Sequence, residues 1–95
     1  MPTKRRALKH APRVGEIRVT ERLLDLWRSF QDEVRKPGPK TVRAADLQQE
    51  LHVVLGHLPW EDGNMHERHY DELHLLAYPN PKTRPERLDV LGKPA

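Results

Sequence analysis

The chain has 95 residues, of which 36% are hydrophobic and 33% charged, with a formal net charge of +3 and no cysteine. This length indicates one small domain, and the lack of cysteine excludes a disulfide framework, a thiolate zinc site and a cysteine nucleophile. No segment approaches the roughly 20 apolar residues of a membrane span, and the basic start lacks the apolar run of a signal peptide. We therefore expect a cytoplasmic protein with no membrane partner.

Residues 1–18 are predicted to form a basic, flexible arm. They carry a formal charge of +5, and prolines and a glycine interrupt any helical period. The stretch "GEIRV" within and just after the arm could form a short extended piece, because Ile17 and Val19 are separated by a charged residue.

Residues 19–78 are predicted to form a three-helix domain. The first helix covers "TERLLDLWRSFQDEVRK", where the Thr20 hydroxyl can accept an otherwise unpaired backbone N–H. Proline in "KPGPK" ends this helix, since the residue before a proline avoids helical geometry. Its apolar residues recur at helical spacing and form one stripe: Leu23, Trp27, Phe30 and Val34.

Two further helices are predicted over about 42–57 and 65–77, joined by "LPWEDGN". Thr41 is the expected cap of the second helix, and Asn64 with Glu67 resembles a capping box for the third. The expected core-facing residues are Leu47, Leu51, Val54 and Leu58 on the second helix and Met65, His69, Leu73 and Leu76 on the third.

Residues 79–95 are predicted to be a proline-rich tail that could contain a short helix over 85–91. Pro85 would occupy the first helical position and Gly92 the position after the last turn. The predicted fold class is thus all-α: a small three-helix bundle with a basic N-terminal arm and a short C-terminal helical or extended tail. Whether the tail docks on its own chain or on another stays open.

The segment "MHERHYDELH" contains three of the six histidines. On a helix His66 and His69 lie about 60° apart, whereas His52 and His57, five residues apart, are splayed by about 140°. A metal site on His66 and His69 would have only half of the four ligands that zinc usually takes. A pH response is a second hypothesis. The favoured interpretation is a helix face on which His69 points to the core and bonds an acid, so no cofactor is expected.

The arm offers a candidate nucleic-acid surface. Five cations without an acid can neutralise phosphates and release counterions, so binding would weaken steeply with salt. The alternative is a solvated tail, because no aromatic residue is available there to stack on bases. The predicted contacts are Lys4, Arg5, Arg6, Lys9 and Arg13.

Residues 49–78 carry a formal charge of −5 and form the candidate protein-binding face. Trp60 lies in a loop, where a tryptophan either covers the end of a small core or anchors a partner. The acidic third helix argues against a helix-turn-helix, because a recognition helix facing phosphate is basic. The predicted partner contacts are Trp60, Glu61, Asp62, Glu67 and Asp71.

The sequence lacks the groupings that catalysis needs: its one serine lies in mid-helix, and it has neither a glycine-rich phosphate loop nor paired carboxylates with a base. We therefore expect a small non-enzymatic interaction or regulatory protein that binds a larger protein assembly, with homo-oligomerisation open. The alternatives are direct nucleic-acid binding through the arm or, less favoured, histidine-dependent metal binding.

Overall fold

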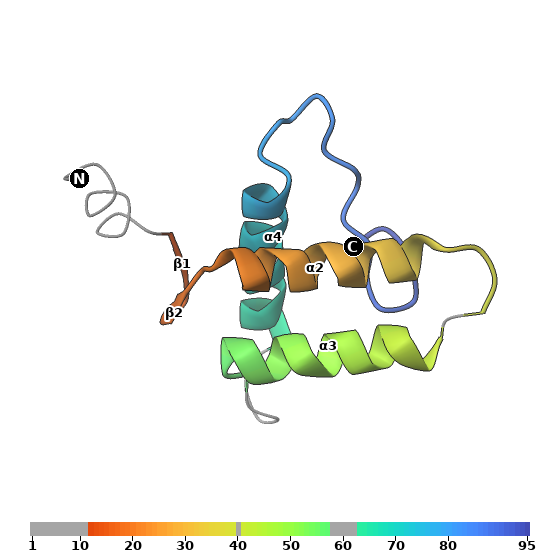
Figure 1. The fold of residues 1–95 in the computed structure, drawn as a ribbon, viewed down its shortest axis with the longest axis horizontal. Helices are drawn as coiled ribbons and strands as arrows, with labels where there is room; N and C mark the ends of the chain where they lie inside the picture. Colours follow the sequence, from red (N-terminus) through yellow and green to blue (C-terminus); the bar gives the residue numbers. More distant parts are fainter. Residues whose placement is uncertain (1–11, 40, 58–62) are drawn as a thin grey trace.

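The structure, a computed structural model, describes residues 12–39, 41–57 and 63–95, and within them the chain forms three helices and one two-stranded sheet. α2 and α3 run in opposite directions beside each other, and α4 crosses them (Figure 1). The mainly helical fold confirms the predicted class in outline. The elements are β1 (Arg13–Val14), β2 (Ile17–Arg18), α2 (Glu21–Arg35), α3 (Val42–Leu55) and α4 (Gly63–Ala77).

α2 supplies the centre of the core, as its apolar spacing predicts. The Thr20 hydroxyl accepts the Leu23 amide at 3.1 Å and so caps the first turn. All four residues of the predicted stripe are buried. Trp27 is the largest of them, and its ring stacks on Tyr70 of α4 with centroids 5.6 Å apart. This aromatic contact fixes where α4 crosses α2.

α3 packs on α2 through a stripe that differs in part from the predicted one. Its cap is confirmed, because the Thr41 hydroxyl accepts the Ala44 amide at 3.3 Å. Leu47 and Leu51 are buried, but Val54 is 41% exposed, and Leu58 lies outside the described residues. The helix is turned so that its contact row is Ala44, Leu47, Leu51 and Leu55.

α4 begins at Gly63, so Asn64 lies inside the helix and the predicted capping position is wrong. Leu73 is fully buried, and Leu76 and Met65 are only partly so. Tyr70 is buried in the core, where the predicted helix face placed His69. No helix in the described part of the chain is both long and apolar enough to cross a membrane.

Residues 12–18 do not belong to a flexible arm. β1 and β2 pair as a tight antiparallel hairpin, and Val14 is 1% exposed because it inserts into the core. Gly15 has φ +59° at the first central turn position, which favours glycine in a type II′ turn. β2 lies in the extended piece predicted for "GEIRV", whereas its pairing with β1 was not predicted, because one buried valine makes no periodic signal; residues 1–11 lie outside the described residues.

We expect Gly15→Ala to lower the free energy of unfolding by about 2–3 kcal/mol in urea titrations. A left-handed conformation costs an alanine about 1–2 kcal/mol, and here the added Cβ would also lie 3.0 Å from His69 Nε2. The matched control is Gly38→Ala, which has φ +91° but no atom within 4 Å of the new Cβ. Equal losses in the two variants would contradict a tight contact between hairpin and helix.

The tail docks on its own chain and contains no helix over 85–91. Residues 84–87 are irregular and Leu88 forms an isolated bridge with Pro94. The helix does not form because side chains of the domain bond the backbone of the tail: Gln31 Nε2 donates to Leu88 O, and Gln31 Oε1 accepts the Leu88 amide. The extended form of the predicted tail is therefore the correct one (Figure 1).

Candidate functional site

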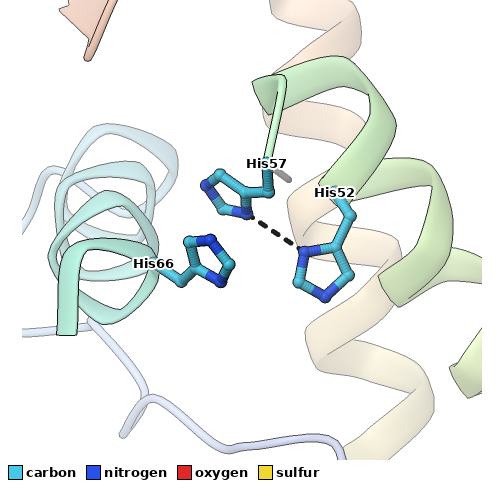
Figure 2. Close-up of side chains that lie close together, drawn as sticks. All are labelled: His52, His57 and His66. Atoms are coloured by element: carbon cyan, nitrogen blue, oxygen red, sulfur yellow. Dashed lines mark hydrogen bonds between the residues drawn. The ribbon is translucent and has the colours of Figure 1, made fainter. Parts of the chain in front are cut away.

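Three histidines from two helices meet where the end of α3 approaches α4. His52 belongs to α3, His57 follows it and His66 belongs to α4 (Figure 2). One nitrogen of each ring lies within 4.8 Å of the other two. His52 Nδ1 and His57 Nδ1 are 3.0 Å apart, and the His57 and His66 rings stack with centroids 3.8 Å apart.

A helix-ending motif brings His52 and His57 together. α3 ends at Leu55, and Gly56 takes a left-handed conformation with φ +71°. The His57 amide then bonds His52 O at 2.9 Å and the Gly56 amide bonds Val53 O at 3.1 Å. These two bonds form a Schellman motif, which places the residues on either side of the turn in side-chain contact. The predicted splay of 140° is wrong because the helix does not extend to residue 57.

The predicted pairing of His66 with His69 is not what the structure displays. His69 Nδ1 lies 2.9 Å from His57 Nε2 and the two rings stack, so His69 contacts the outer side of His57. The acid expected to bond His69 is replaced by this imidazole. The signal that sequence reasoning missed is "HVVLGH", two histidines flanking a helix-ending glycine.

The environment of His52 and His57 favours their neutral forms. Burial, followed by the neighbouring imidazoles, lowers the pKa of His57 to about 4, and burial with His66 lowers the pKa of His52. The Tyr70 hydroxyl lies 3.2 Å from His52 Nδ1, and burial raises its pKa to about 12, so it stays protonated. A neutral imidazole has a free lone pair, which is the form that binds metal ions.

His74 is a buried residue of the core. Trp27 Nε1 donates to its Nδ1 at 3.1 Å, so its Nε2 carries the proton and donates to Pro85 O at 2.7 Å. Burial lowers the pKa of His74 and three nearby arginines act in the same direction, although the bond to Pro85 opposes them. Protonation would place a second N–H against the Trp27 donor. His74 thus joins α2, α4 and the tail.

We expect the free energy of unfolding to fall as the pH drops from 7 towards 4. A histidine whose pKa is lower in the folded state stabilises the fold above its ordinary pKa near 6.5, and this stabilisation is lost as the folded form protonates. His57 alone should contribute about 1–2 kcal/mol once solvent screening is allowed for. Urea titrations at several pH values test this. His74→Gln, which does not titrate, should give a shallower dependence; identical curves would contradict the assignment.

Of the five predicted protein-binding residues, the structure describes Glu67 and Asp71. Glu67 and Asp71 both bond Arg87 of the tail, at 2.6 Å and 2.7 Å, and so hold the tail against α4. Trp60, Glu61 and Asp62 lie outside the described residues. The partner contacts predicted on α4 are therefore already engaged within the chain.

Of the five predicted nucleic-acid contacts, the structure describes Arg13. Arg13 is exposed on β1 and donates to Glu16 O at 3.2 Å. The other four, Lys4, Arg5, Arg6 and Lys9, lie outside the described residues, so nucleic-acid binding stays a prediction.

A groove of about 480 Å³ lies between the start of α2 and the end of α3. Leu23, Leu26 and Val54 make its apolar surface, and charged side chains edge it. Val53, the neighbour of Val54, is 69% exposed. The remaining lining residues are Thr20, Arg22, Asp25, Ser29 and Glu50.

The structure therefore offers two features with chemical capacity: a cluster of three imidazoles and an apolar groove with a charged edge. The first has the donor atoms of a late transition-metal site, and the second has the composition of a binding surface. Comparison of the chain with models of known protein families, with curated proteins and with solved structures found no match.

Proposed function

We propose that this chain is a small, non-enzymatic interaction protein that binds a helix of a larger protein in the groove between α2 and α3. The observation that carries the proposal is the exposed apolar edge of α3, where Val54 lines the groove and stands 41% exposed. The helical spacing of α3 predicts that Val54 packs on α2, yet its side chain is partly exposed.

The groove has the composition of a protein interface. Such interfaces place apolar side chains at the centre and polar ones at the rim. Here Leu23 and Leu26 lie on one wall, while Arg22 and Asp25 of α2 and Glu50 of α3 supply charges of both signs at the edge. A partner helix with an apolar stripe and flanking charged residues matches this pattern.

A helix suits the groove better than a small molecule does. The groove volume of about 480 Å³ is within the range of small-ligand pockets. Yet Val53, the residue beside Val54 on α3, is also an exposed valine, at 69%. A helix lying along α3 would cover both valines, whereas a ligand held within the groove would leave Val53 in water.

The test is a pull-down with the tagged full chain from its native cell, with and without nuclease, followed by mass spectrometry. We expect one dominant protein that survives nuclease and is lost with Val54→Glu. Val42→Glu is the matched control, because Val42 is on the same helix, is 77% exposed and is not among the groove-lining residues. Both variants should melt at the temperature of the parent protein.

Two outcomes would overturn the proposal. Equal capture by the parent chain and Val54→Glu would remove the groove from the interaction, and loss of every partner on nuclease treatment would favour nucleic-acid binding through the arm. Analytical ultracentrifugation separates a third case. If the parent chain dimerises with concentration and Val54→Glu does not, the groove binds a second copy of this chain.

A further inference from the structure

We propose that His52, His57 and His66 bind one divalent late transition-metal ion, with Zn²⁺ the expected ion. Three imidazole nitrogens from different positions in the fold already lie within 4.8 Å of one another. Imidazole suits zinc and its late first-row neighbours, whereas Mg²⁺ and Ca²⁺ prefer oxygen ligands. The site adds a function to the protein that is independent of the groove.

The spacing of the nitrogens is close to what zinc requires. Zn–N bonds of about 2.0–2.1 Å at tetrahedral angles put two ligand nitrogens about 3.3–3.4 Å apart. His52 Nδ1 and His57 Nδ1, at 3.0 Å, are already near that separation. His66 comes from the facing helix, and its ring lies parallel to that of His57. Binding therefore requires the His66 ring to tilt out of this stack.

The groups around the three rings are those that orient metal ligands. A metal-bound histidine usually bonds its other ring nitrogen to a second group, which fixes the ring. His57 Nε2 lies 2.9 Å from His69 Nδ1, which leaves Nδ1 for the ion. The Tyr70 oxygen lies 3.4 Å from His52 Nε2 and can accept a hydrogen bond from its N–H once Nδ1 binds the ion. His69 and Tyr70 are positioning residues in this arrangement.

Three protein ligands leave the fourth zinc position for water or for a group from another molecule. The three rings are only partly buried, so an ion can reach them from solvent. The ion would link the end of α3 to α4, two helices that each pack mainly on α2. Because the unfolded chain does not hold these histidines together, binding should raise the melting temperature.

The test is a titration of the full, metal-free chain with Zn²⁺ against a coloured competing chelator. We expect one ion per chain and a higher melting temperature with Zn²⁺ but not with Mg²⁺. His52→Gln, His57→Gln and His66→Gln should each weaken binding by at least about tenfold. His69→Gln should have a smaller effect, and Co²⁺ should give the absorption of a four-coordinate nitrogen-rich site that His66→Gln loses.

The matched control is His10→Gln, which also leaves five histidines but changes none of the proposed ligands. If His57→Gln loses helical content, His52→Gln and His66→Gln decide the result. Imidazole ¹⁵N spectra of the parent chain give a test without variants, because Zn²⁺ should shift the ligand nitrogens of His52, His57 and His66 and leave those of His74 unchanged. Unchanged ligand spectra, or affinity that is equal in the parent chain and in His66→Gln, would overturn the proposal.

Discussion

Replacing Leu73 with alanine is expected to lower the free energy of unfolding by about 2–5 kcal/mol. Leu73 is fully buried at the centre of α4, so the variant loses the transfer free energy of its side chain and leaves a cavity. A small domain has only about 5–15 kcal/mol in total. The change should therefore remove a large part of its stability, as measured by urea titration of the helical ellipticity.

Leu75 is the matched control for this prediction. It is two residues along the same helix, has the same side chain and is 51% exposed. Leu75→Ala should change the free energy of unfolding by less than about 0.5 kcal/mol, as surface substitutions generally do. Similar losses in both variants would mean that α4 packs with a different face.

The starts of α2 and α3 were predictable because each has a local signal. Thr20 and Thr41 each precede an apolar run and accept the amide three residues on, so the starts of α2 and α3 follow from neighbouring residues alone. The stripe on α2 was correct throughout, because this helix contacts both other helices and needs a wide apolar face. α3 packs on α2 with only one of its sides, and the stripe predicted for α3 was wrong at Val54.

The histidine cluster was not predictable from helical angles, because its geometry depends on where α3 stops. Treating residues 42–57 as one helix separates His52 from His57, whereas a left-handed Gly56 folds His57 back. The position of His66 depends further on how α4 crosses α2, which is a tertiary property. The packing of Val14 and the docking of the tail were not predicted for a related reason: Val14 and Leu88 are ordered by contacts with distant residues and not by their neighbours in sequence.

Gln31 provides the second prediction, because it is fully buried and bonds the tail in the manner of a neighbouring strand. Its side-chain amide donates to Leu88 O at 2.9 Å and accepts the Leu88 amide at 3.0 Å. Gln31→Leu replaces the polar side chain with an apolar one of similar size and leaves both backbone groups of Leu88 without these bonds. We expect a loss of about 2–4 kcal/mol in the free energy of unfolding, since each stranded buried group costs about 1–3 kcal/mol.

Gln31→Leu also tests whether the bonds of Gln31 hold the tail on the domain. Leu88 and Val90 pack against the core, and Arg87 bonds α4, so the tail closes one side of the domain. In Gln31→Leu the Leu88 amide should exchange with deuterium much faster, while amides at the centre of α2 stay protected. Gln49→Leu, at an exposed position of α3, is the control and should change neither quantity. Unchanged exchange at Leu88 in Gln31→Leu would show that Arg87 and the apolar contacts hold the tail without the glutamine.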